Sequence, residues 1–252
     1  MARRKIGAWY RLAVTVLRPV LMASTRRDWR GAEYLPRSGG FVVCVNHISH
    51  ADPFTFTHFL YDNGFLPRFL TKEALFRTFF IGRVVSGAKQ IPVYRESSDA
   101  SRAYSAAVQA VRAGECVAIY PDATLTRDPG MWPMRGKTGA ARIALETGCP
   151  VIPVAQWGAQ EILAPYTHVP HLVPRHTSHV WAGPPVDLSA FQDQPQSAEV
   201  LRGATDAIVG DITRLLEEIR GAKAPAERWN PREHDLPLVG NPRQRTRRDG
   251  AR

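Results

Sequence analysis

The sequence is poor in cysteine. Its 252 residues contain three cysteines, Cys44, Cys116 and Cys149, which lie far apart and each within an apolar stretch. An odd number of cysteines without CxxC spacing argues against both a disulfide framework and a structural zinc site. The pattern favours a reducing environment, such as the cytosolic side of a membrane.

Several patterns that would identify a function are also absent. No apolar run reaches the roughly eighteen residues that a membrane-spanning helix needs. A signal peptide is not expected, because Arg11 and Arg18 interrupt the apolar part of the N-terminal segment and no small-residue cleavage site follows. The chain has neither a GxxxxGK[ST] loop nor a GxSxG turn. These absences exclude a P-loop nucleotide site and leave a serine acyl-enzyme unsupported.

Acidic residues are too few to balance the basic ones. The chain has 33 Lys and Arg against 23 Asp and Glu, which gives a formal net charge of +10. This excess favours an anionic partner: nucleic acid, an anionic membrane or a phosphorylated substrate. We expect no nucleic-acid partner, because recognition-helix, RRM and zinc-finger patterns are missing and few aromatic residues lie among the basic runs.

The basic excess is concentrated in residues 1–30, which contain eight Lys or Arg and one Asp. Apolar residues recur there at three-to-four spacing, which predicts an amphipathic helix. They are Ile6, Trp9, Tyr10, Val14, Leu17 and Leu21. Such a helix suits a bilayer surface, where arginine side chains reach the phosphate groups. The alternative is an ordinary amphipathic helix that packs on the core and turns its arginines to water.

Apolar segments alternate with helix-like segments through the rest of the chain, of which 44% is apolar. We expect strands at 41–45, 68–72, 90–95, 116–121 and 149–157, with helices within 52–64, 73–87, 98–115, 137–148 and about 196–220. Weak strands are expected between 160 and 190. The alternation predicts a single α/β domain over residues 31–222, with a mostly parallel central sheet flanked by helices. The basic tail, residues 223–252, is predicted to be disordered.

Polar segments follow three of the predicted strands: NHISHAD at 46–52, Tyr-Arg at 94–95 and YPDATLTRD at 120–128. Sites in open α/β sheets form where strands end, so we expect these segments to share a cleft. His47 suits proton abstraction from a hydroxyl. The Asp52 carboxylate could accept a hydrogen bond from the other ring nitrogen of His47 and so orient the imidazole. The alternatives are that Asp52 only caps a helix whose first position is Pro53, and that His47 is a solvated loop residue.

A metal site is a competing interpretation of the same segment. His47, His50 and Asp52 have the pattern H-x2-H-x-D, whereas zinc sites take three or four protein ligands. The other clustered histidines lie far along the chain, at 168, 171, 176 and 179, and no acidic residue accompanies them in the sequence. We therefore expect no metal.

The second and third polar segments supply groups suited to phosphate. Arg95 and Arg127 are accompanied by a carboxylate, Asp122, and a hydroxyl, Thr124. Guanidinium groups bind phosphate through paired hydrogen bonds. The alternative is that these arginines are solvated and that Asp-Ala-Thr is an ordinary turn.

In order along the chain, NHISHAD, GAKQIPVYR, YPDATLTRD and VIPVA resemble the four sequence blocks of the glycerolipid acyltransferases, and most closely those of the bacterial 1-acyl-sn-glycerol-3-phosphate acyltransferases. The resemblance covers about residues 35–160 and, more weakly, VWAGPPVDL. His47 and Asp52 match the NH-x4-D pattern of the first block. Arg95 matches the arginine that ends the second block, and Pro153 matches the proline of the fourth.

The third block departs from the family pattern, which usually reads Phe-Pro-Glu-Gly-Thr-Arg-Ser. This chain has Asp122 for the glutamate, Ala123 for the glycine and Leu125 for the arginine. Arg127, two positions later, is expected to supply the missing charge. These departures leave other acceptors open: glycerol-3-phosphate, another lysophospholipid or a glycolipid. A metal-dependent hydrolase and a basic nucleic-acid-binding protein are weaker alternatives.

The resemblance implies an O-acyltransferase without a cofactor. It would move an acyl chain from acyl-CoA or acyl-ACP to the free hydroxyl of 1-acyl-sn-glycerol-3-phosphate, giving phosphatidic acid in phospholipid biosynthesis. His47 would deprotonate that hydroxyl while Asp52 holds the ring. The acceptor phosphate would be neutralised by Arg95 and Arg127 with Lys72 and Lys137. The protein would be peripheral or monotopic on the cytoplasmic face of the plasma membrane.

Overall fold

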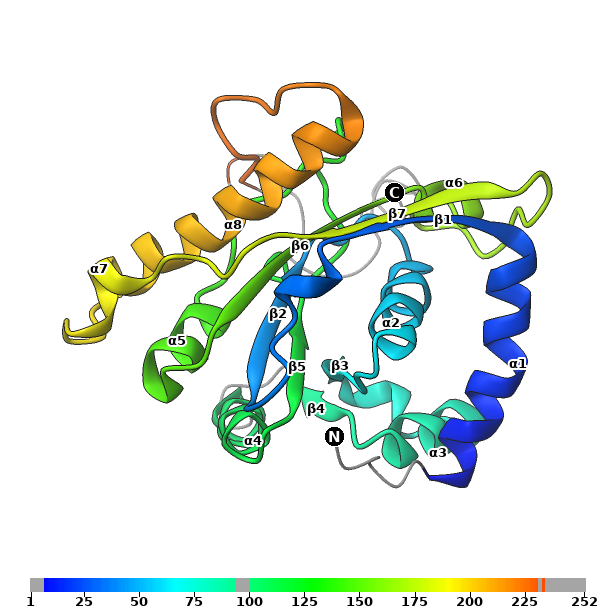
Figure 1. Cartoon of the computed structure of the whole chain (residues 1–252), viewed down its shortest axis with the longest axis horizontal. Coiled ribbons are helices and arrows are strands. Elements are labelled where there is room, and N and C mark those ends of the chain that lie inside the picture. Colours follow the sequence, from blue (N-terminus) through cyan, green and yellow to red (C-terminus); the bar gives the residue numbers. More distant parts are fainter. Residues whose placement is uncertain (1–6, 94–99, 231–232, 234–252) are drawn as a thin grey trace, which may run out of the picture.

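A seven-stranded sheet forms the centre of the protein in the computed structural model, which describes residues 7–93, 100–230 and 233 (Figure 1). The strand order is β1-β7-β6-β2-β5-β3-β4. The strands are β1 (Thr25–Arg30), β2 (Phe41–Val45), β3 (Arg68–Lys72), β4 (Ile91–Val93), β5 (Cys116–Ile119), β6 (Val151–Trp157) and β7 (His176–Ala182). All neighbours pair in parallel except β6 with β7. The predicted α/β class with a mostly parallel sheet is confirmed.

Helices cover both faces of the sheet. They are α1 (Ala8–Ser24), α2 (Asp52–Asp62), α3 (Phe79–Gly87), α4 (Ala100–Arg112), α5 (Gly139–Thr147), α6 (Ala159–Ile162), α7 (Ser189–Gln192) and α8 (Ala198–Arg220). Helices α4, α5 and α8 pack on one face, whereas α2 packs on the other. The fully apolar sequence of β2 is explained by this arrangement, because its side chains point alternately into both layers: Val42 and Cys44 join the first, and Val43 and Val45 the second.

The parallel pairing places the carboxyl ends of β6, β2, β5, β3 and β4 along one edge of the sheet. The loops that follow β2 and β5 leave from this edge side by side, because these two strands are neighbours. Helices α2 and α5 begin there too, after those loops. The first and third polar segments of the sequence therefore meet, as the sequence predicts.

Two local predictions were wrong. Residues 25–30 form the strand β1 rather than the end of the N-terminal helix. The charged sequence TRRDWR has no strand-like alternation, and it is extended because it pairs with β7 at the edge of the sheet. Residues 73–87 form a short 3-10 turn (Glu73–Leu75) and then α3, because the chain bends at Phe76–Thr78. Most of the predicted disordered tail lies outside the described residues.

Helix α1 lies at the outer side of α2 and contacts α3, at the right of Figure 1. Tyr10, Val14 and Leu21 are half-buried against the protein. The opposite side of α1 is also apolar and exposed, at Trp9, Leu12, Val16, Leu17 and Val20. Within the described part of the chain, no helix is both long enough and apolar enough to cross a bilayer.

Candidate active site

The loop after β2 brings His47 and Asp52 together. Nδ1 of His47 lies 2.8 Å from Oδ2 of Asp52. The same oxygen accepts the backbone N–H groups of Ile48 at 2.6 Å and Ser49 at 2.8 Å. The Asp52 side chain is fully buried, whereas 15% of the His47 side chain is exposed. Three donors thus converge on one carboxylate oxygen and fix the loop around it.

The alternative that Asp52 only caps a helix is contradicted. Helix α2 begins at Asp52 itself, follows Ala51 and has no side-chain cap, with Pro53 in its first turn. The carboxylate points back to the loop that precedes the helix and bonds Ile48 and Ser49 there. It therefore orients the histidine and holds the loop, and does not satisfy the N–H groups of the helix.

This contact determines which nitrogen of His47 can act as a base. A carboxylate only accepts hydrogen bonds, so the tautomer assigned to His47 carries its proton on Nδ1. Nε2 then keeps its lone pair. A partly exposed imidazole with Nδ1 held in this way can remove a proton from a hydroxyl that reaches Nε2.

Asn46 and Gln156 anchor the start of this loop, and the sequence reasoning missed both. The Nδ2 of Asn46 donates to the Gln156 carbonyl at 3.0 Å, and its Oδ1 accepts the Gln156 backbone N–H at 2.8 Å. The Gln156 amide donates to the Asn46 carbonyl at 2.9 Å. Both side chains are buried. The available signal in the sequence was a polar amide side chain in an apolar strand region. Asn46 directly follows β2, and Gln156 lies within the neighbouring strand β6.

The loop after β5 is bonded directly to the His47 loop. The backbone N–H of Thr126 donates to the His47 carbonyl at 2.7 Å. Asp122 is buried, and its Oδ1 accepts the backbone N–H of Met134 at 3.0 Å. Burial raises the pKa of Asp122 to about 7, although the Met134 bond and the charge of Arg228 act in the opposite direction. Ala123 adopts a left-handed conformation, with φ of 55°.

The predicted phosphate ligands occupy different environments. Lys72, at the end of β3, and Lys137, just before α5, are exposed. The backbone N–H of Lys137 donates to the Pro121 carbonyl, which ties it to the β5 loop. Thr124 is half-buried, and Arg127 is only 7% exposed. Arg95 lies outside the described residues.

The histidines that the structure describes are not grouped as metal ligands. Among the described residues, no three or more His, Cys, Asp and Glu side chains form a group that could hold a metal ion. Two of the distant histidines nevertheless have acidic partners in the structure. Nδ1 of His176 contacts Glu161 at 3.1 Å, and Nδ1 of His179 contacts Asp28 at 2.7 Å. These acidic partners come from α6 and β1, so sequence proximity could not identify them.

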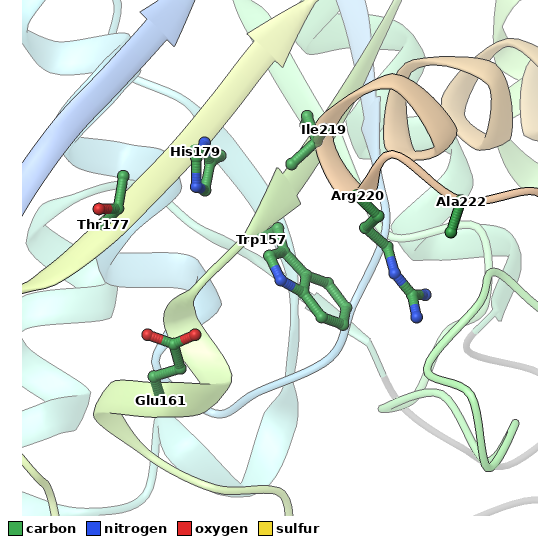
Figure 2. Close-up of a pocket in the computed structure, with 7 residues that line it drawn as sticks. All are labelled: Trp157, Glu161, Thr177, His179, Ile219, Arg220 and Ala222. Atoms are coloured by element: carbon green, nitrogen blue, oxygen red, sulfur yellow. The ribbon is translucent and has the colours of Figure 1, made fainter.

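His179 lines a separate pocket of about 500 Å³ at the end of α8 (Figure 2). The guanidinium of Arg220 lies over the Trp157 ring, 4.3 Å from its centroid. The other lining residues are Glu161, Thr177, Ile219 and Ala222. The pocket shares no residue with the site predicted from the sequence.

Comparisons with known proteins agree on the kind of protein. The family model described as Acyltransferase matches residues 26–157. The chain is 28% identical over 154 residues to the 1-acyl-sn-glycerol-3-phosphate acyltransferase of Borreliella burgdorferi, with 57% of this chain and 60% of that protein covered. It is 30% identical over 140 residues to the chloroplastic 1-acyl-sn-glycerol-3-phosphate acyltransferase BAT2 of Brassica napus, with 55% and 39% covered. The matched segment thus spans less than two thirds of either relative.

The fold has a counterpart among solved structures. The crystal structure of the 1-acyl-sn-glycerophosphate (LPA) acyltransferase PlsC from Thermotoga maritima superposes with a TM-score of 0.60. The match covers 83% of this chain and 82% of that chain, with 20% sequence identity. At this identity the likeness concerns the fold.

Proposed function

The chain belongs to the acyltransferase family, and from this premise we propose that it transfers an acyl chain from a thioester to the free hydroxyl of 1-acyl-sn-glycerol-3-phosphate. The donor is acyl-CoA or acyl-ACP, and the product is phosphatidic acid. The observation that carries the proposal is the 2.8 Å contact between His47 Nδ1 and Asp52 Oδ2, which leaves Nε2 as a base. The names of the two curated relatives support this choice of acceptor.

The reaction follows from this geometry. Nε2 of His47 takes the proton of the acceptor hydroxyl as its oxygen attacks the thioester carbonyl. The buried carboxylate of Asp52 stabilises the imidazolium that forms. When the tetrahedral intermediate collapses, the C–S bond breaks and the thiolate takes the proton from Nε2. The new ester and a free thiol leave, and the histidine is again neutral.

The acyl group passes directly to the acceptor in this proposal. Cys44 is the cysteine nearest to His47 in the sequence, but it is fully buried in the core and burial raises the pKa of its thiol. A thiol of this kind is inert as a nucleophile. The sequence also offers no GxSxG serine.

The acceptor phosphate is proposed to bind the basic side chains on the same edge of the sheet. Lys72 and Lys137 are exposed there and can move to the phosphate. Arg95 and Arg127 complete the proposed set of cations, and Asp122 and Thr124 are proposed to contact the substrate beside them. We expect Arg95→Ala to raise the KM for the acceptor with less effect on the KM for the thioester. An unchanged acceptor KM would remove Arg95 from the phosphate site.

The third block gives a specific reason to test other acceptors. Leu125 is buried where the family pattern has an arginine, and Arg127 is buried as well. The decisive assay measures thioester consumption with a panel of lysophosphatidate, glycerol-3-phosphate, other lysophospholipids and a glycolipid, with acyl-CoA and acyl-ACP in parallel. Fastest turnover with lysophosphatidate supports the proposal, whereas preference for another acceptor would replace it.

We also propose that α1 and α3 dock on the anionic cytoplasmic surface of the plasma membrane. The support is an exposed apolar surface shared by the two helices. The Trp9 ring of α1 packs against the Phe80 ring of α3, with ring centroids 5.8 Å apart. Phe79 is 80% exposed, and Phe80 and Ile81 are exposed beside it. Soluble surfaces rarely display such groups together, and the basic N-terminal segment would add attraction to anionic lipid.

The docking proposal is tested by flotation with phosphatidylglycerol–phosphatidylcholine vesicles. Phe79→Ser with Phe80→Ser is expected to lose most of the bound fraction. Val169→Ser with Val173→Ser is the matched control, because these exposed apolar residues lie outside α1 and α3. Equal binding of both double variants would contradict docking through α3.

A further inference from the structure

Three rings stack at the carboxyl edge of the sheet. The Tyr120 ring lies on the His47 imidazole, with centroids 4.1 Å apart and planes inclined by 21°. The Phe69 ring lies 5.9 Å from the Tyr120 ring, with planes inclined by 18°. The rings come from three different segments: the loop after β2, the residue that follows β5, and β3.

Tyr120 is well placed to be rigid. Its carbonyl accepts the backbone N–H of Ala123 at 2.9 Å, within the loop that Thr126 ties to the His47 carbonyl. Its ring packs against the buried cluster that contains Phe69. Burial, together with the charge of Asp52, raises the pKa of the Tyr120 phenol well above its ordinary value. The Tyr120 phenol is therefore neutral at physiological pH and does not act as a base beside His47.

A single hydrogen bond does not fix an imidazole. The contact with Asp52 holds Nδ1, but the ring can still swing about that contact and move Nε2 away from a substrate. A flat ring at 4.1 Å blocks this swing on one side. An aromatic face also attracts a cation, so it favours the imidazolium that forms during the reaction.

We propose that Tyr120 is a positioning residue: its ring face holds the His47 imidazole in the plane that aims Nε2 at the acceptor hydroxyl. This inference rests on the proposed function, because it deepens the role assigned to His47. The ring and not the hydroxyl makes the stacking contact, so phenylalanine can replace tyrosine and an aliphatic side chain cannot.

The kinetic test compares Tyr120→Leu with Tyr120→Phe. Tyr120→Leu is expected to lower kcat by about 10- to 100-fold, because small errors in the placement of a base cost about this much. Both KM values are expected to stay within about threefold, since Tyr120 holds the base and not the substrate. Tyr120→Phe is expected to keep kcat within about threefold of wild type.

A matched core variant separates positioning from general destabilisation. Phe41→Leu removes a buried ring from the same cluster, at the opposite end of β2 from His47. It is expected to lower the melting temperature at least as much as Tyr120→Leu and to leave kcat within about threefold. An equal fall of kcat in Phe41→Leu and Tyr120→Leu would reduce Tyr120 to a packing role and overturn the proposal.

A second measurement does not depend on turnover. The ring protons of His47, assigned by their loss in His47→Gln, should show upfield ring-current shifts in NMR spectra of wild type and Tyr120→Phe, and lose them in Tyr120→Leu. Unchanged His47 signals in Tyr120→Leu would overturn the stack. A wild-type protein that turns over no acceptor but shows these shifts would contradict the proposed function while leaving the stack in place.

Discussion

Among the described residues, the pairs His47–Asp52 and His179–Asp28 have almost the same geometry but lie in different surroundings. His47 Nδ1 lies 2.8 Å from Asp52 Oδ2, and His179 Nδ1 lies 2.7 Å from Asp28 Oδ2. The Asp52 carboxylate is fully buried and accepts two backbone N–H groups. The Asp28 carboxylate is 27% exposed and is shared with Trp181 and Arg30. The contact distance alone therefore does not distinguish the proposed base from its counterpart.

The two pairs also differ in their place in the fold. Asp28 and His179 face each other in register across the parallel pair β1–β7, at the side of the sheet. His47 follows a central strand at the carboxyl edge. Burial alone would raise the pKa of Asp28, but the hydrogen bonds from His179, Trp181 and Arg30 outweigh burial and lower it. The comparison teaches that the burial of the carboxylate and the backbone N–H groups that hold it separate the proposed base from its counterpart.

The strongest test removes each imidazole. His47→Ala is expected to lower kcat for acyl transfer by about 10³- to 10⁴-fold, because the base is lost. His179→Ala is expected to keep kcat within about threefold. Circular dichroism melting checks that both variants are folded. Equal losses of activity would mean that the surroundings of the two pairs do not separate their roles.

The second test keeps both rings and neutralises each carboxylate. Asp52→Asn is expected to lower kcat by about 10²- to 10³-fold, because the amide no longer stabilises the imidazolium or selects its tautomer. Urea unfolding should also show a stability loss of about 1–3 kcal/mol, since buried N–H donors lose a charged partner. For Asp28→Asn we expect a stability loss of less than about 1 kcal/mol and little change in kcat. A larger kinetic loss in Asp28→Asn than in Asp52→Asn would reverse the comparison.

Asp122 extends the comparison to a buried carboxylate that accepts a backbone N–H but is not paired with a histidine. Burial raises its pKa from 3.8 to about 7, so between these values the folded protein binds a proton that the unfolded chain releases. Its contribution to stability is therefore fully favourable below about pH 4, falls as the pH rises, and is lowest above about pH 7. Asp122→Asn removes this dependence.

Urea unfolding of wild type and Asp122→Asn at pH 5 and pH 8 measures the effect. As the pH rises, the free energy of unfolding of Asp122→Asn should increase relative to that of wild type, by on the order of a few kcal/mol across the full interval. A constant difference between the two proteins at both pH values would show that Asp122 is ionised throughout.

The smallest effect concerns the loop that contains Asp122. Ala123 has φ of 55°, a conformation that costs a non-glycine residue about 1 kcal/mol. Ala123→Gly is therefore expected to raise the free energy of unfolding by up to about 1 kcal/mol. Ala106→Gly, within α4, is the matched control and should lower it by about 0.5–1 kcal/mol. Equal destabilisation by Ala123→Gly and Ala106→Gly would show that the backbone of Ala123 is not strained.

Much of the fold was accessible from local sequence patterns. Residues 41–45, 68–72 and 116–119 are strands as predicted, and α2 and α8 fall where periodicity and turn residues indicate. The proximity of His47 and Asp52 was also predictable, because five residues span one tight turn before a helix. The contradicted alternative that Asp52 only caps a helix shows the limit: spacing indicates that a carboxylate is near, but not which N–H groups it meets.

The sequence by itself determined the order of strands and helices from β2 to β6, the polar segments at the strand ends and the close spacing of His47 and Asp52, because these depend on residues a few positions apart. The tertiary structure alone decided that TRRDWR is a strand, that Gln156 holds Asn46 across 110 residues, and that Tyr120 lies on His47. It also decided that His179 has an acidic partner from the other end of the chain. The physical reason is that these features arise from pairing and packing between distant segments, and such contacts leave no periodic or local signal in the sequence.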